Sequence, residues 1–478
     1  MRTRITAVVL AAALTPLALT LSAPAAHAAT PAAPYDFNGD GRTDLAIGAP
    51  GATVAGQARA GAVSVVYGST SGPKSSTRTL LTQNTAGMPD AAEADDAFGS
   101  ALASADLNTD GYADLLIGTP GEDTGGDTND GTVVMVWGSA TGLSGARTLV
   151  NDYRTEADRF GQALAAGDLD RDGDLDVAVG SNGPLGLVFV NGPFAKSGGY
   201  HGSSASGFPD SYSTSYGVTS LAAGPVTAPW HTSLVAHGRR TGTDDAITHW
   251  VPDPSIGNYA DWLGDLPAGY VSAIGDIDKD GYGDIAVGNE REPSADPAAA
   301  LGGKVTVVYG TGPDDPRPDR APLVLTQDTA GVPGASEQGD RFGSGVSLGD
   351  VDGDGFADLA IGAAGENSAA GAVTVLFGSA SGLTAQGATS YTQNTAGVPG
   401  GSEKGDRFGA RVTLTDHTGD RRADLSVSAP GENAGDGAVW SLRSTATGPT
   451  ATGSVSFGPG TTGVSTAGTP GYGTALNS

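Results

Sequence analysis

The amino-acid sequence predicts an all-β fold, a seven-bladed propeller of four-stranded antiparallel blades. A loop of the form Asp-x-Asp/Asn-x-Asp-Gly-x-x-Asp recurs along the chain, each time between short apolar runs. Four such runs make up a repeating unit, and Gly, Pro, Asn and Asp fill the gaps between them as turn formers. The last residues resemble a strand that the first unit lacks. Together these observations indicate a closed ring of sheets with almost no helix.

The N-terminal residues have the pattern of a secretory signal peptide, predicted here over residues 1–28. Arg2 and Arg4 precede an apolar stretch at 5–21, and Ala26-His27-Ala28 supplies a cleavage signature of small residues. Pro16 interrupts the apolar stretch, which disfavours a transmembrane anchor, and no later stretch approaches the ~20 apolar residues that a span needs. We therefore expect a secreted, extracellular protein without a membrane span, folded as a single propeller domain over residues 29–478.

Sequence features flanking the loops define the blades. An aromatic-Gly pair precedes several loops, as at Phe98-Gly99 and Phe342-Gly343, and a strand ending in Gly-Ala-Pro-Gly or a variant of it often follows, as at 48–51. The long interval between the loops that begin at Asp168 and Asp276 has room for one further unit, in which 225–229 replace the aspartates. The predicted blades are 35–84 with 470–478 (blade 1), 96–152 (blade 2), 158–200 (blade 3), 214–258 (degenerate blade 4), 266–328 (blade 5), 340–394 (blade 6) and 406–460 (blade 7).

The two ends of the chain predict how the ring closes. The first loop, at Asp36, has no aromatic-Gly strand before it, whereas residues 471–476 have the same pattern as residues 97–102. We infer that the C-terminal strand enters blade 1. Closure of this kind removes the exposed sheet edges that promote aggregation.

These motifs resemble the FG-GAP repeats of the integrin α-subunit head. The resemblance rests on the Phe-Gly and Gly-Ala-Pro pairs, on the loops between them and on the seven-fold repetition, and it covers nearly all of residues 29–478. It implies calcium in the loops, which would join the first two strands of each blade on the lower face. The chain departs from the family in blade 4, in the seventh-blade loop and at Ala268-Gly269, where Phe-Gly is expected. The leg, transmembrane and cytoplasmic segments of integrins are absent, which argues against a signalling role.

Carboxylates as crowded as those of the loops repel one another unless a hard cation lies among them. Side chains at places one, three, five and nine can direct oxygens inward, glycine at place six permits the positive φ of the turn, and place seven offers a backbone carbonyl. The predicted ligands are Asp36, Asn38, Asp40, Arg42 and Asp44 in blade 1; Asp106, Asn108, Asp110, Tyr112 and Asp114 in blade 2; Asp168, Asp170, Asp172, Asp174 and Asp176 in blade 3; Asp276, Asp278, Asp280, Tyr282 and Asp284 in blade 5; Asp350, Asp352, Asp354, Phe356 and Asp358 in blade 6; and Asp416, Thr418, Asp420, Arg422 and Asp424 in blade 7.

Ca²⁺ is the ion that suits these loops, because their ligands are all oxygens and their geometry is flexible. An EF-hand would need a glutamate at place twelve followed by a helix, but place twelve is a strand residue such as Ile47 or Val287. Five loops are intact. A solvated acidic turn is the alternative throughout, and it is strongest for the seventh-blade loop, in which Thr418 and Arg421 replace a carboxylate and the glycine.

Composition narrows the classes of function. The formal net charge of −28 argues against nucleic-acid binding, which requires a basic surface. The chain has no cysteine, so disulfides cannot stabilise it and thiol catalysis is excluded. Bound metal is therefore expected to stabilise a sequence that contains 76 glycines.

Nothing in the sequence predicts catalysis, and we expect the chain not to be an enzyme. Residues 345–349 match the nucleophile pattern G-x-S-x-G, but they lie in a predicted strand and lack the strand-turn-helix context of that motif. The histidines, four of which lie near blade 4, form no compact ligand pattern.

Adhesion or protein interaction is the function that the resemblance implies, with a partner bound by loops on the face opposite the aspartates, such as 84–96 and 121–130. Carbohydrate binding is the alternative, although no aromatic platform repeats between blades. Hydrolysis is a third class, because FG-GAP repeats accompany catalytic domains in some enzymes, but the propeller is expected to occupy the whole mature chain. The partner, a protein or a glycan, is not identified by the sequence.

Overall fold

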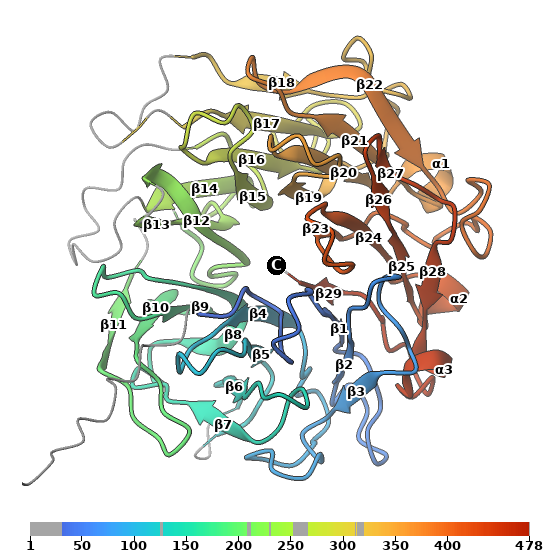
Figure 1. The fold of residues 1–478 in the computed structure, drawn as a ribbon. Coiled ribbons are helices and arrows are strands. Elements are labelled where there is room, and N and C mark those ends of the chain that lie inside the picture. The colour runs from blue at the N-terminus through green and yellow to red at the C-terminus, as the bar shows by residue number, and fades with distance from the viewer. Residues whose placement is uncertain are drawn as a thin grey trace, which may run out of the picture.

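Seven β-sheets form a ring around a central axis in the computed structural model (Figure 1). The structure describes residues 31–124, 128–207, 212–228, 231–251, 266–310, 312 and 320–477, so the predicted signal peptide and residues 252–258 of blade 4 lie outside the described residues. Within the described part, no helix is long and apolar enough to cross a membrane.

Six of the sheets have four antiparallel strands, and blade 4 has three among the described residues. From the axis outward, the strands are β29 (Ala475–Leu476), β1 (Leu45–Ala49), β2 (Ala62–Val66) and β3 (Arg78–Leu81) in blade 1; β4 (Ala101–Ala105), β5 (Asp114–Thr119), β6 (Thr132–Val136) and β7 (Ala146–Leu149) in blade 2; β8 (Asp158–Gly167), β9 (Asp176–Asn182), β10 (Leu187–Asn191) and β11 (Gly202–Ser206) in blade 3; and β12 (Ser220–Ala228), β13 (His231–Arg239) and β14 (Ala246–Val251) in blade 4.

The remaining blades repeat this order. Their strands are β15 (Val271–Gly275), β16 (Asp284–Asn289), β17 (Lys304–Val308) and β18 (Leu323–Leu325) in blade 5; β19 (Phe342–Gly349), β20 (Asp358–Ala363), β21 (Ala372–Phe377) and β22 (Thr384–Tyr391) in blade 6; and β23 (Val412–Thr415), β24 (Asp424–Ala429), β25 (Ala438–Leu442) and β28 (Val455–Phe457) in blade 7. A small hairpin, β26 (Ser444–Thr445) with β27 (Gly448–Pro449), and three four-residue helices, α1 (Glu366–Ala369), α2 (Glu432–Gly435) and α3 (Pro459–Thr462), complete the described elements. The expectation of almost no helix is confirmed.

The ring closes as the sequence predicts. The C-terminal strand β29 pairs antiparallel with β1, with Ile47 opposite Leu476 and Gly48 opposite Ala475. Tyr472 pairs with Gly437 of blade 7 in a parallel bridge, as Phe98 pairs with Gly61 one blade further on. Tyr472 therefore takes the place of the missing phenylalanine.

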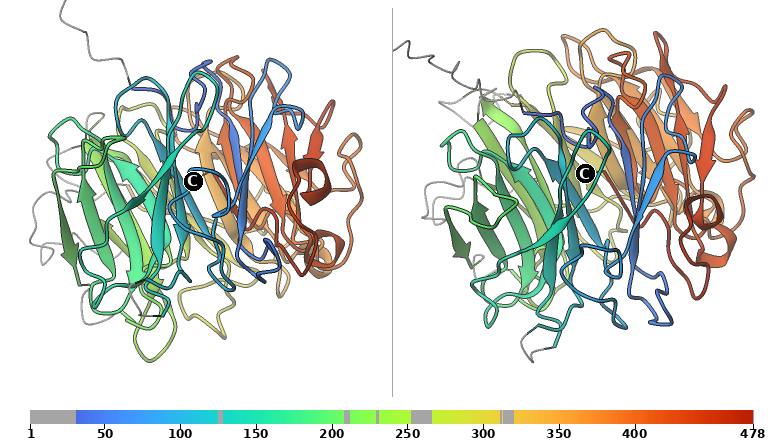
Figure 2. Two further views of the ribbon diagram at one scale, coloured as in Figure 1. Left: turned by 90° about the horizontal axis from the view of Figure 1, so that it is seen from below. Right: turned by 60° about the horizontal axis from the view of Figure 1, so that its bottom comes forward.

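The core lies between neighbouring blades, where the strands of one sheet pack against those of the next (Figure 2). Phe342 and Phe408 are almost fully buried and fill the space at two blade junctions. The glycine in the second strand lets the next blade approach, because a Cβ at Gly362 would overlap the carbonyl oxygen of Gly409. This close approach explains the glycine of the Gly-Ala-Pro motif.

Candidate metal centre

Each aspartate loop connects the first and second strands of its blade. In blade 6, β19 ends at Gly349, the loop runs from Asp350, and β20 begins at Asp358. The strands of a blade alternate in direction, so the connections between second and third strands lie at the opposite end of the ring. We call the end with the aspartates the lower face and the other end the upper face.

The first aspartate of a loop organises the turn around itself. In blade 6, Oδ1 of Asp350 accepts a hydrogen bond from the N–H of Asp354 at 3.2 Å, and Oδ2 accepts one from Gly355 at 2.8 Å. Gly355 has a φ of 87°, and the glycines at the same place share the positive φ that the sequence predicts: Gly41, Gly111, Gly173 and Gly281. Arg421 adopts this left-handed conformation in blade 7, with a φ of 69°.

The ninth-place aspartate ties the loop to the blade. Asp358 is buried, and its Oδ2 accepts the N–H of Val351 at 2.7 Å while Oδ1 accepts the N–H of Gly378 at 2.8 Å. The pKa of Asp358 is raised to about 7, mainly by burial; the two hydrogen bonds oppose this rise, and the nearby carboxylates of Asp352 and Asp350 add to it. Burial likewise raises the pKa of the equivalent residues, to about 8 for Asp44, about 7 for Asp114, Asp284 and Asp424, and about 6 for Asp176.

Three loops bring carboxylates from places one, three and nine together. One oxygen of each residue lies within 4.8 Å of the others in three groups: Asp168, Asp170 and Asp176; Asp276, Asp278 and Asp284; Asp350, Asp352 and Asp358. The Oδ1 atoms of Asp168 and Asp278 are buried and accept no hydrogen bond from the described residues. A cation would satisfy these orphaned oxygens and offset the repulsion, and an all-carboxylate set fits a hard ion such as Ca²⁺.

The place-five aspartates Asp172, Asp280 and Asp354 lie outside these three groups of side-chain carboxylates. In blade 6, Oδ1 of Asp354 accepts the N–H of Phe356 at 3.0 Å. The same hydrogen bond joins Asp40 to Arg42, Asp110 to Tyr112, Asp172 to Asp174, Asp280 to Tyr282 and Asp420 to Arg422. This bond closes the second half of the turn.

The loops of blades 1, 2 and 7 differ at place three. Asn38 and Asn108 stand there in blades 1 and 2, and Nδ2 of Asn108 donates to Asp114 at 3.1 Å. In blade 7, Oδ1 of Asp416 accepts hydrogen bonds from the N–H and hydroxyl of Thr418 at 3.1 and 3.2 Å. Protein donors therefore supply part of the positive charge around Asp416 that a cation would supply in blade 6.

Backbone hydrogen bonds connect the loops around the ring. The carbonyl of Asp350 in blade 6 accepts the N–H of Ala423 in blade 7, at 2.7 Å. In the same way, the carbonyl of Asp416 accepts the N–H of Thr43, the carbonyl of Asp36 accepts that of Ala113, and the carbonyl of Asp276 accepts that of Ala357. An ion that orders one loop thus also orders a contact with the next blade.

The upper face contains buried acids whose burial the sequence reasoning missed. Asp96 and Glu122, which lie in loops predicted to meet a partner, are both 2% exposed, and Nε2 of Gln83 donates to Glu122 at 2.5 Å. Gln327 with Glu366 and Gln393 with Glu432 repeat this contact. The signal that could have revealed them is the recurrence of Gln before Asn/Asp-Thr-Ala-Gly and of Glu after Pro-Gly or Ala-Gly. Asp96 and Glu122 are therefore not available to a partner, whereas Glu366 and Glu432 are half-buried.

Comparison with known proteins identifies the repeat. The model of the FG-GAP repeat family matches residues 29–66, 98–134, 160–190, 268–308 and 342–376. The phosphatidylinositol-glycan-specific phospholipase D of Rattus norvegicus is 34% identical over 181 residues, which are 38% of this chain and 20% of that protein. Integrin alpha-IIb of Mus musculus is 36% identical over 156 residues, 31% of this chain and 14% of that protein.

The matched region is a small part of each relative, since this chain spans about a fifth or less of their length. Among solved structures, an arginine-to-alanine triple mutant of AofleA from Arthrobotrys oligospora aligns with a TM-score of 0.38 and 11% identity, covering 75% of this chain and 86% of that one. The matched motifs coincide with the blades described above. The chain is therefore an FG-GAP repeat protein with a seven-bladed propeller, distantly similar to integrin α and to the phosphatidylinositol-glycan-specific phospholipases D.

Proposed function

We propose that this chain is a secreted, calcium-stabilised propeller that acts as an adhesion or protein-interaction module and not as an enzyme. The observation that carries the calcium assignment is the grouping of three carboxylates within 4.8 Å in each of three loops, two of which contain a buried oxygen without a hydrogen-bond partner. Ca²⁺ would hold the first two strands of these blades together on the lower face, with the upper face presented to a partner.

The serine of the nucleophile-like sequence pattern makes a hydrogen bond between two blades. Ser347, the serine of the G-x-S-x-G match, lies within β19, and its Oγ accepts the N–H of Leu414 in blade 7 at 2.9 Å. This bond links two blades, which supports the interaction module over a hydrolase. Similarity to the phospholipases covers only a fifth of their length and supports no shared activity.

Two measurements test this proposal. Calcium titrated into the metal-free protein, followed by calorimetry, is expected to show several equivalents bound with dissociation constants of roughly 10⁻⁴ to 10⁻³ M.

The second measurement concerns the partner. Immobilised protein in calcium is exposed to native culture supernatant and, in parallel, to a glycan array. A retained protein that is lost after EDTA treatment supports the module. Absence of calcium binding, or turnover of an ester or glycoside by the purified chain, would overturn it.

A further inference from the structure

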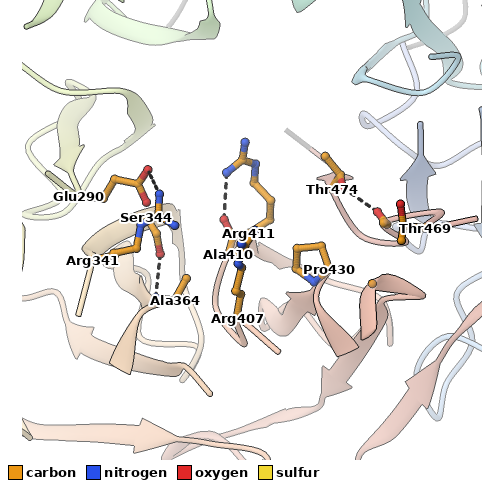
Figure 3. A pocket seen from close by; sticks show the side chains of 12 residues that line it. Glu290, Arg341, Ser344, Ala364, Arg407, Ala410, Arg411, Pro430, Thr469 and Thr474 are labelled. Atoms are coloured by element: carbon orange, nitrogen blue, oxygen red, sulfur yellow. Dashed lines mark hydrogen bonds and ion pairs between the residues drawn. The ribbon is translucent and has the colours of Figure 1, made fainter. Parts of the chain in front are cut away.

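A cavity of about 360 Å³ opens on the upper face where blades 5, 6 and 7 meet the C-terminal segment. Its charged lining residues are Glu290, Arg341, Arg407 and Arg411 (Figure 3). Arg341 precedes β19 and Arg411 precedes β23, whereas the aspartate loops follow these strands. The cavity therefore lies at the opposite end of the blades from the carboxylate groups.

The arginines outnumber the carboxylates in this cavity. Nη2 of Arg341 pairs with Oε1 of Glu290 at 2.9 Å. Among the described residues, neither Arg407 nor Arg411 forms an ion pair, and Nη1 of Arg411 donates only to the backbone carbonyl of Ala410, at 2.9 Å. Two guanidinium groups thus lack a carboxylate partner in a chain whose formal net charge is −28.

Arg411 is an exception within the repeat. It stands three residues after Phe408, at a place where four other blades have alanine or glycine: Ala101, Ala163, Gly345 and Ala475. The backbone of Arg411 lies close to Gly345 of the neighbouring blade. A Cβ added to Gly345 would lie 3.2 Å from the Cα of Arg411. The long side chain extends into the cavity between Glu290 and Arg341 on one side and Thr469 and Thr474 on the other (Figure 3).

The surroundings of Arg411 leave its charge poorly compensated. The Arg411 side chain is exposed to solvent, and Glu290, the carboxylate among the residues that line the cavity, is already paired with Arg341. Guanidinium forks bind oxyanions through two parallel hydrogen bonds, so arginines that lack a carboxylate partner favour an anionic ligand with matching geometry.

We propose that this cavity binds an oxyanion, a carboxylate or sulfate group carried by a ligand of the upper face. The proposal rests on the function proposed above, because it names the chemistry of the group that the interaction module recognises. Arg411 and Arg407 supply the charge, and the hydroxyl groups of Thr469 and Thr474 line the opposite wall. Glu290 holds Arg341 in place through their ion pair.

The experiment uses the purified calcium-loaded chain and calorimetry with sodium sulfate and, separately, sodium succinate at constant ionic strength. We expect saturable binding of at least one anion with a Kd of about 1 mM or tighter. Arg411→Gln is expected to weaken this binding at least tenfold, and Arg411→Lys, which retains the charge without the fork, to weaken it less. Arg154→Gln makes the same charge change at an exposed site outside the cavity and is the matched control.

The outcomes distinguish this proposal from the calcium assignment. Binding that Arg411→Gln abolishes while Arg154→Gln leaves it intact supports the cavity, even if EDTA were to leave the fold unchanged. The cavity proposal is overturned if neither anion binds saturably to a chain whose circular dichroism shows the folded state, or if both glutamine variants bind alike. Neither of those results would bear on calcium in the lower-face loops.

Discussion

Blade 6 and blade 4 occupy equivalent places in the ring, but different side chains stabilise them. Blade 6 joins its first two strands through the loop Asp350–Asp358, in which three carboxylates gather. In blade 4, Ala228 at the end of β12 pairs with His231 at the start of β13, and no aspartate is present at the corresponding place in the sequence. Even so, the carbonyl of Pro225 accepts the N–H of Gly283 in blade 5 at 2.8 Å, as the carbonyl of Asp350 accepts that of Ala423.

Blade 4 also differs at its junction with blade 5. The phenylalanine of the Phe-Gly pair is replaced there by Ala268. The buried ring of His237 lies at this junction, with Nδ1 3.0 Å from the carbonyl oxygen of Gly269 and Nε2 2.9 Å from the hydroxyl of Ser272. Blades 4 and 6 therefore share the backbone contact to the following blade, but different side chains stabilise it. Blade 6 should depend on a cation and blade 4 on a neutral histidine.

Removal of calcium is expected to have the largest effect on the stability of the protein, through blade 6 and the other blades with carboxylate loops. Ions that bind only the folded state at about 10 mM calcium would contribute about 1 to 3 kcal/mol for each occupied site. Calorimetric scans in calcium and in EDTA should therefore show a lower thermal midpoint in EDTA, with partial or no rescue by magnesium. An unchanged midpoint would mean that the carboxylate loops of blade 6 and its relatives are stable without an ion.

Acidification is expected to weaken blade 4 through His237 and blade 7 through His417, because burial lowers the pKa of both histidines to about 4. Burial lowers the pKa of His237 from its usual 6.5 to about 4, so the unfolded chain binds a proton at a pH where the folded chain does not. The stability that the neutral ring contributes is complete above pH 6.5 and is lost as the pH falls from 6.5 to 4, by about 2 to 3 kcal/mol.

Urea unfolding between pH 7 and pH 4 in saturating calcium measures this loss. In His237→Gln the stability should fall less steeply over the same interval, from a lower starting value at pH 7. Equal slopes in both proteins would show that the histidine of blade 4 does not control the acid response.

A single ligand substitution is expected to have the smallest effect and to separate the two blades most cleanly. Asp352→Ala removes the third-place carboxylate of blade 6, and the calcium stoichiometry should fall by one equivalent, with a loss of about 1 to 3 kcal/mol in calcium only. Thr227→Ala changes the corresponding place of blade 4 and is the matched control. It breaks a hydrogen bond to His231 but should leave the stoichiometry unchanged. An identical calcium count in all three proteins would contradict a site in blade 6.

The repeated pattern made much of this structure predictable. The strand order, the positive φ at Gly355 and the closure of blade 1 by the C-terminal strand all follow from short motifs whose spacing repeats. The degenerate blade 4 was visible as an interval without aspartates, although the role of His237 was not. Its neighbours Gly269 and Ser272 come from the next blade, and no local pattern joins them to it.

The sequence by itself determined the ring and its loops, because alternation, glycine placement and the aspartate register are local properties that each blade repeats. Only the tertiary structure decided which carboxylates meet, which acids become buried and where unpartnered arginines gather. Places one, three and nine converge because the ninth carboxylate is fixed by Gly378, which directly follows the third strand of its blade. Arg411 reaches a cavity because the residues around it, such as Glu290 and Thr474, are contributed by separate blades. Burial and charge compensation depend on such neighbours, which are distant in the chain.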